Sequence, residues 1–168
     1  NAFLEPEQNR SIEAGNKWLV GNGALQIDTA LFEIVKRNAR VPDPNNPGFN
    51  ALSGEQKVEG ISVSLTGTLL PGLSINGGYT YLYSEEVKTA ATLDNQGRAL
   101  VNVARDNFSL WLNHAFAPGI ESGMGARYIG PRYARNTAPV NQVPGYWAFD
   151  ASGKYVVNRN LTLKLSLT

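Results

Sequence analysis

The sequence contains no cysteine and no stretch of apolar residues long enough to cross a membrane as a helix. The absence of cysteine excludes disulfide frameworks, thiolate zinc sites and cysteine nucleophiles. A membrane-spanning helix needs about 18 or more consecutive apolar residues. We therefore expect no such helix in this sequence.

The sequence also lacks an excess of either charge, because 15 Lys and Arg residues face 14 Asp and Glu residues in a chain of net charge +1. A protein that binds nucleic acid normally shows a clear basic excess, so nucleic acid is not an expected partner.

The single histidine, His114, has no cysteine or carboxylate at ligand spacing, and we expect no metal site. Glu85 and Glu86 point to opposite faces of an expected strand and cannot act as an acid and base pair. We expect no enzyme, no catalytic residue and no covalently bound cofactor.

The strongest positive signal is an alternation of apolar and polar residues with a period of two. Apolar residues or glycine take every odd position of 61–69, and serine or threonine takes every even one. The same pattern covers 73–84 and 161–168. In each segment one face is apolar and the other is rich in hydroxyl-bearing or charged residues. A period of two is typical of strands with two different faces. Weaker versions predict further strands over 11–20, 24–37, 107–117, 121–130 and 145–156. The sequence therefore predicts eight strands and no helix.

The connections between these strands alternate between short and long. Short turns are expected at 21–23, 71–72, 118–119 and 158–160, and long polar loops at about 38–56, 85–105 and 131–144. Outer-membrane barrels have short periplasmic turns on one rim and long extracellular loops on the other. Their strands show apolar residues to lipid only at alternate positions, so the mean hydropathy of −0.24 is compatible with a membrane protein. The predicted fold class is all-β, an antiparallel transmembrane β-barrel.

Aromatic residues cluster near the expected strand ends, where barrels carry girdles of Tyr and Trp at the lipid headgroups. Trp18 and Tyr155 lie near short turns. The aromatic residues near the long loops are Tyr79, Tyr81, Tyr83, Tyr128, Tyr133, Tyr146 and Trp147. Two girdles are therefore expected.

Several short sequence segments, in order along the chain, resemble those of TonB-dependent siderophore receptors. They include Leu4-Glu5-Pro6-Glu7, Gly78-Tyr79-Thr80-Tyr81, Gly125-Ala126-Arg127-Tyr128-Ile129-Gly130 and Val143-Pro144-Gly145-Tyr146. The resemblance implies a barrel of about 22 strands in the outer membrane of a Gram-negative bacterium, plugged by an N-terminal domain that engages TonB. It implies that 1–168 forms one partial barrel domain, without the plug and the closing strand. A complete eight-stranded barrel is disfavoured, because the expected strand directions would place both chain ends outside the cell.

The long loops contain the candidate ligand-binding residues, because such receptors would bind their cargo from outside the cell. Basic side chains outnumber acidic ones in the first loop region and around the third. Arginine can donate paired hydrogen bonds to an anion and can stack on aromatic rings. The candidates are Arg37, Arg40, Arg132, Tyr133 and Arg135.

The resemblance implies import of a ferric siderophore, with this segment supplying barrel wall and binding loops. The implied partners are the Fe(III)-siderophore itself, TonB through the missing plug, and the lipid and lipopolysaccharide of the outer membrane. The alternatives are a TonB-dependent receptor for cobalamin, haem or a glycan, a passive porin, and a soluble β-sandwich binding module.

Overall fold

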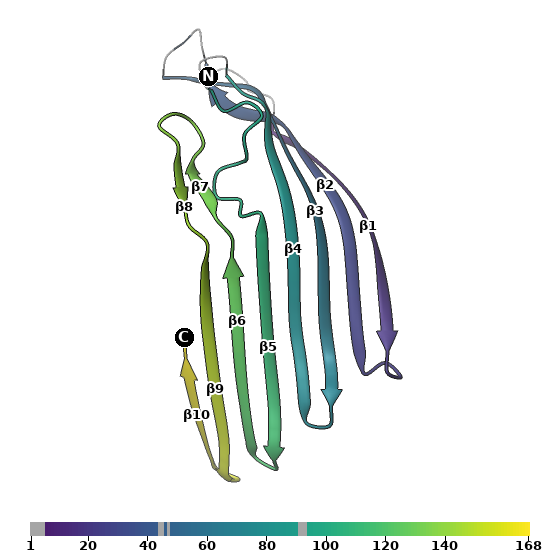
Figure 1. Ribbon diagram of the computed structural model, residues 1–168. Helices are drawn as coiled ribbons and strands as arrows, with labels where there is room; N and C mark the ends of the chain where they lie inside the picture. Colours follow the sequence, from purple (N-terminus) through teal and green to yellow (C-terminus); the bar gives the residue numbers. More distant parts are fainter. Residues whose placement is uncertain (1–5, 44–45, 47, 91–93) are drawn as a thin grey trace.

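The computed structural model describes residues 6–43, 46, 48–90 and 94–168. Eight strands form one antiparallel sheet in the order β1-β2-β3-β4-β5-β6-β9-β10, and two short strands, β7 and β8, form a second small sheet (Figure 1). The strands are β1 (Gln8–Val20), β2 (Leu25–Pro42), β3 (Asn50–Leu70), β4 (Leu73–Lys88), β5 (Asp106–Ala117), β6 (Ile120–Ile129), β7 (Arg132–Arg135), β8 (Asn141–Val143), β9 (Tyr146–Asn158) and β10 (Leu161–Leu167). Among the described residues there is no helix long and apolar enough to cross a membrane.

The eight long strands confirm the predicted all-β architecture, and the four short turns lie where the sequence places them. Gly21, Asn22 and Gly23 all have positive φ, at 60°, 56° and 83°, and Ala24 N donates to Gly21 O at 3.1 Å. Glycine and asparagine tolerate this backbone region best. All four short turns lie at one end of the sheet, opposite the long connections (Figure 1).

Two of the predicted loops contain more strand than the sequence suggests. β2 continues to Pro42 and β3 begins at Asn50, so most of the expected loop 38–56 is paired strand. The expected loop 131–144 contains β7 and β8. The alternation that identified the other strands is absent here, because these parts do not pass through lipid.

The strand registers put the alternating residues on two chemically different faces. One hydrogen-bonded row, Val63, Tyr79, Phe108, Tyr128 and Trp147, crosses five strands on the apolar face. The neighbouring row on the opposite face contains Ser64, Gly78, Ser109, Arg127 and Ala148.

Large apolar side chains on the apolar face are exposed over much of the sheet. Leu31 is 60% exposed, Met124 61%, Phe149 69% and Leu165 64%. The buried apolar residues of the described chain, Ala39, Val41, Ala90, Leu100 and Ala104, lie instead in the long-loop half. No second layer covers the eight-stranded sheet in the described part of the chain, which contradicts a soluble β-sandwich. An uncovered apolar face of this size suits contact with hydrocarbon.

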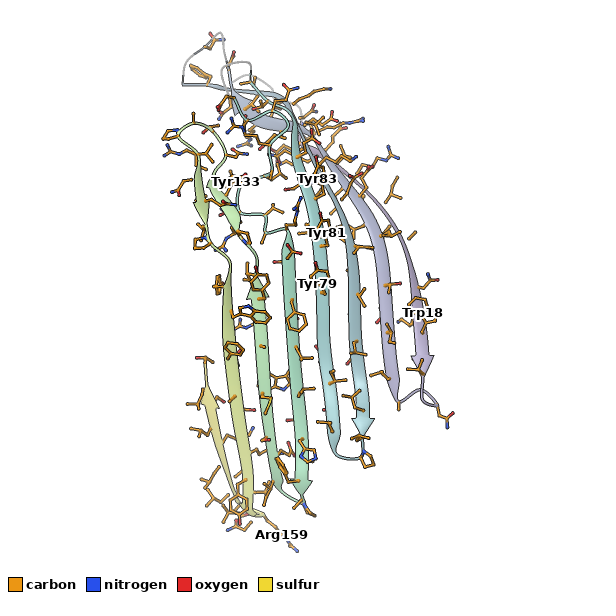
Figure 2. All side chains as sticks on the ribbon, in the orientation of Figure 1. Trp18, Tyr79, Tyr81, Tyr83, Tyr133 and Arg159 are labelled. Carbon is orange, nitrogen blue, oxygen red and sulfur yellow. The ribbon has the colours of Figure 1, made fainter. Side chains whose placement is uncertain are left out.

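Aromatic side chains form the expected girdle on the side of the long loops. Trp147 lies 5.0 Å from Tyr128 and 5.9 Å from Phe108 between ring centroids. Tyr79, Tyr81 and Tyr83 follow one another along β4 towards the loops, and Trp18 lies near the opposite end of β1 (Figure 2). Tyr146 was expected near this girdle, but its pairing with Ile129 places it on the polar face.

The polarity of the two faces inverts beyond this girdle. The face that is apolar below the girdle carries Glu33, Glu59 and Glu85 above it. Lys57 Nζ lies on the same face, 3.2 Å from Glu33 and 2.6 Å from Glu59. The opposite face of the same strands contains Phe32, Val58 and Leu82 in place of hydroxyl groups. Charged residues are expensive in hydrocarbon. The inversion therefore marks the outer boundary of the membrane, and the ends of β2, β3 and β4 project beyond it.

Aromatic rings on the polar face lie flat against glycines. The Trp111 ring covers Gly123 and Gly125, and the Phe32 ring covers Gly60, so closely that a methyl group at any of these glycines would overlap the ring. Glycine at these positions allows the rings to pack along the sheet.

We expect Gly125→Ala to destabilise the protein by about 1–3 kcal/mol, because the added methyl group must displace the Trp111 ring. The free energy of unfolding in detergent micelles, from a urea titration, measures this effect. Gly153→Ala is the matched control, because a Cβ at Gly153 meets nothing within 4 Å. Equal stabilities of the two variants would contradict the proposed packing.

Candidate functional site

The region of interest begins where β4 extends beyond the start of β5. β5 begins at Asp106, opposite Tyr81, so the last residues of β4 have no partner in β5. The segment 94–105 takes that place: Leu82 N donates to Arg105 O at 2.7 Å, and Glu86 N donates to Arg98 O at 2.8 Å. The same segment reaches β7, where Asn102 N donates to Tyr133 O at 2.8 Å. The wall therefore continues from β4 through this segment to the small sheet of β7 and β8 (Figure 1).

Asn136, which is only 4% exposed, joins the two long connections. Its Nδ2 donates to Ala99 O at 2.9 Å, and its Oδ1 accepts from Asn95 Nδ2 at 3.3 Å. Its backbone oxygen accepts from Arg98 Nη1 at 3.3 Å. Asp94 adds a further link, since its carboxylate accepts from Arg98 at 3.0 Å and from Ala138 N at 3.2 Å. The segment 94–105 and the β7–β8 hairpin are therefore one connected unit.

Glu86 is a buried carboxyl group at the base of this unit, outside the membrane boundary. It is 9% exposed, and Gln56 Nε2 donates to both of its carboxylate oxygens at 3.3 Å. Burial raises the pKa of Glu86, and the hydrogen bonds from Gln56 and Asn136 offset part of that rise.

A cavity of about 290 Å³ lies between β4, the segment 94–105 and the β7–β8 sheet. Its lining includes Leu82, Ser84, Val103, Arg105, Arg132, Tyr133 and Gln142. The Arg132 guanidinium lies 5.9 Å from the centre of the Tyr146 ring, and its Nη1 is buried without a hydrogen-bond partner among the described residues. A buried donor without an acceptor is costly, so an anion that reached this nitrogen would relieve that cost.

The structure separates the predicted binding residues into two groups. Arg132 and Tyr133 line the cavity, and the exposed Arg135 follows them on β7 outside the cavity lining. Arg37 and Arg40 lie on β2 and are exposed. Arg37 Nε is 3.8 Å from Glu55, which also contacts Lys88 at 3.4 Å.

Two other residues beside the cavity could not be chosen as candidates from the sequence. Arg105 lines the cavity and lies 5.5 Å from the centre of the Tyr81 ring, and Tyr146 lies under Arg132. Both placements depend on how the long connections pack. The only signal in the sequence was their position at the edges of predicted loops.

These features together define a segment of an outer-membrane β-barrel: a lipid-facing apolar band, an aromatic girdle, short turns at one rim and a polar inner face. The sequence matches the family described as TonB dependent receptor-like, beta-barrel over residues 1–168, and the chain belongs to that family. Members of this family are transporters of the Gram-negative outer membrane and not enzymes, and this excludes a passive porin.

One relative and the structures of two other proteins illustrate the similarity. The probable TonB-dependent receptor BfrD of Bordetella pertussis is 31% identical over 98% of this chain and 23% of its own length. The crystal structure of the siderophore receptor PiuA from Acinetobacter baumannii superposes with a TM-score of 0.82 at 32% identity, covering 96% of this chain and 24% of that one. The closed form of the ferric-catecholate import receptor Fiu from Escherichia coli K12 gives a TM-score of 0.79 at 29% identity, over 97% and 23% of the two chains. This chain therefore spans about a quarter of the length of the relatives it matches.

We expect Asn136→Ala to loosen the connected unit, because it removes the side-chain hydrogen bonds to Ala99 and Asn95. Amide hydrogen exchange in 94–102 should become roughly 10-fold faster, as expected for the loss of about 1–2 kcal/mol of local stability. Asn141→Ala on the exposed side of β8 is the control. Unchanged exchange in 94–102 would show that Asn136 does not join the two connections.

A second prediction concerns pH. Because the pKa of Glu86 is raised in the folded state, the protonated carboxyl group stabilises the fold. This stabilisation is fully present below the ordinary pKa of a glutamate and is lost as pH rises through the raised pKa. Glu86→Gln should therefore slow amide exchange near Glu86 at neutral pH, once intrinsic rates are corrected for. The difference from the wild type should disappear on acidification. Glu85→Gln, on the other face of β4, removes the same charge and should show no such pH-dependent gain.

Proposed function

We propose that this chain forms barrel wall and binding loops of a receptor that imports a ferric siderophore across the outer membrane, coupled to TonB. The observation that carries the proposal is Arg132, which lines a cavity beyond the membrane boundary and whose buried Nη1 has no hydrogen-bond partner among the described residues. The names of relatives support it, since PiuA is called a siderophore receptor and Fiu a ferric-catecholate import receptor.

The chemistry of the cavity suits a flat, anionic iron chelate. Arg132 offers a charged donor and Tyr133 an aromatic ring, and Gln142 offers an amide. Guanidinium groups bind anionic oxygens and stack on aromatic rings such as catecholates. Arg135, Arg37 and Arg40 are exposed outside the cavity lining, and their charges would attract an anion over a longer range.

The receptor needs parts beyond this segment. β1 and β10 are the edges of the sheet, and an open edge is not stable in hydrocarbon, where each unpaired backbone group costs several kcal/mol. We propose that 1–168 is a partial barrel domain whose edges pair with other strands of the receptor. The plug, and contact with TonB through it, would likewise belong to another part of the longer protein.

Arg132→Ala in the full-length receptor should weaken the binding of a ferric catecholate by about 10- to 100-fold, since it removes a charged hydrogen bond of about 1.5–3 kcal/mol. Fluorescence quenching in detergent measures the affinity, and uptake of radioactive iron by cells gives the transport rate. Arg135→Ala is the matched control and should have a much smaller effect. If the wild-type receptor bound neither ferric catecholates nor ferric hydroxamates, the proposal would be overturned.

A further inference from the structure

The outer face of β2, β3 and β4 carries two tiers of charged residues beyond the membrane boundary. These three strands have a paired neighbour on each side, so their outer face is complete within this chain. In the lower tier, Lys57 lies 3.2 Å from Glu33 and 2.6 Å from Glu59, and Glu85 is paired with Lys57 in the next strand. Acidic groups outnumber the basic one there, so the lower tier repels anions.

The upper tier has the opposite balance of charge. Arg37, Glu55 and Lys88 lie side by side on β2, β3 and β4, because Glu55 is the partner of both basic residues in the two ladders. Arg37 Nε is 3.8 Å and Lys88 Nζ is 3.4 Å from the same oxygen, Oε2 of Glu55. Two cations share one carboxylate, and the upper tier therefore keeps an excess of positive charge.

The donors of the upper tier remain available to a ligand. The side chain of Glu55 is 21% exposed, whereas those of Arg37 and Lys88 are 62% and 65% exposed. The contact of Arg37 with Glu55 is longer than a hydrogen bond, and exposed ion pairs of this kind contribute little stability. The planar guanidinium group can donate two parallel hydrogen bonds to a phosphate, and an ammonium group adds a point charge.

A hollow of about 310 Å³ lies at the upper tier. Its lining residues are Arg37, Asn38, Gly54, Glu55 and Lys88. Both ladders shift register here, between Arg37 and Ala39 and between Glu55 and Gln56, and Asn38 has a positive φ of 56°. Bulges redirect side chains and interrupt the regular wall. The two cations therefore border a recess in the barrel wall instead of a flat strand surface.

The position of the hollow indicates what can occupy it. Glu55 is four residues beyond Glu59 of the lower tier, a distance of about 13 Å along the strand. The outer leaflet of a Gram-negative outer membrane consists of lipopolysaccharide, whose sugar core carries phosphate groups above its lipid anchor. The upper tier continues the lipid-facing side of the same strands at the height of these sugars.

We propose that Arg37 and Lys88 bind a phosphate group of the lipopolysaccharide core in this hollow. Basic side chains next to a membrane bind anionic head groups in this way. The acidic lower tier disfavours the phosphates of the lipid anchor, so the receptor selects the phosphorylated core above them. The ligand reaches the hollow from the membrane side of the wall. The proposal is therefore independent of the imported cargo and of what fills the barrel.

Titration of the full-length receptor with defined lipids tests this site. The receptor is purified in detergent, freed of bound lipopolysaccharide and titrated with three probes: lipopolysaccharide with a phosphorylated core, the same molecule after removal of the core phosphates, and lipid A without any core. Microscale thermophoresis gives the affinities. The wild type should bind the first probe about 10-fold more tightly than the other two.

The double variant Arg37→Gln, Lys88→Gln should lose this preference and keep the affinity for lipid A, which shows that its wall is folded. The matched control is Lys17→Gln with Lys154→Gln. It removes two basic residues of the polar inner face, whose ion pairs with Asp28 and Glu121 measure 3.8 and 3.0 Å, and should keep the preference.

Glu55→Gln provides a change in the opposite direction. It removes the carboxylate that competes for both cations, so the phosphorylated core should bind about 3-fold more tightly. Equal affinity of the wild type for the three probes, or a preference that survives in the Arg37 and Lys88 double variant, would overturn the phosphate site. Neither result would affect the proposed import function, which depends on the binding of a ferric siderophore.

Discussion

The requirement that every backbone N–H and C=O group within hydrocarbon has a hydrogen-bond partner governs this structure. The strand ladders are continuous through the middle of the sheet. Register shifts in the described strands lie outside this middle part, for example between Arg37 and Ala39, between Thr68 and Leu70, and between Ala115 and Ala117. An uninterrupted ladder fixes which face each side chain takes. The lipid-facing girdle and the placement of Arg127 and Tyr146 on the polar face both follow from that register.

The sequence predicts the fold well where lipid imposes a pattern. Residues 61–69 alternate strictly because one face meets hydrocarbon, and the turn at 21–23 is visible from its glycines. The pairing of 39–42 with 50–54 could not be predicted, because strands beyond the membrane boundary have no reason to keep an apolar outer face. Arg132 and Tyr133 could be chosen as candidates from residue type and position in a loop. Arg105 and Tyr146 could not, because their roles depend on the packing of the segment 94–105 against β4 and on the register of β9.

The long connections are ordered by contacts with each other as much as by the strands that carry them. Arg98 is bound to Asp94 and to the backbone oxygen of Asn136, and Ser84 Oγ accepts from Leu100 N at 3.2 Å. The upper cavity is enclosed by this unit and by β4. A ligand that contacts Arg132 therefore contacts a unit built from two long connections, and its binding would affect the stability of both.

The inversion of face polarity at the girdle divides the chain into two zones with different chemical demands. Below it, substitutions must satisfy lipid on one side of the sheet and the polar interior on the other. Above it, the projecting ends of β2, β3 and β4 and the connected unit lie in water and headgroups, where the outer face of the strands carries charged residues and the buried contacts lie within the loops. Recognition of a new ligand can therefore evolve, or be engineered, in the upper zone without altering how the barrel inserts into the membrane.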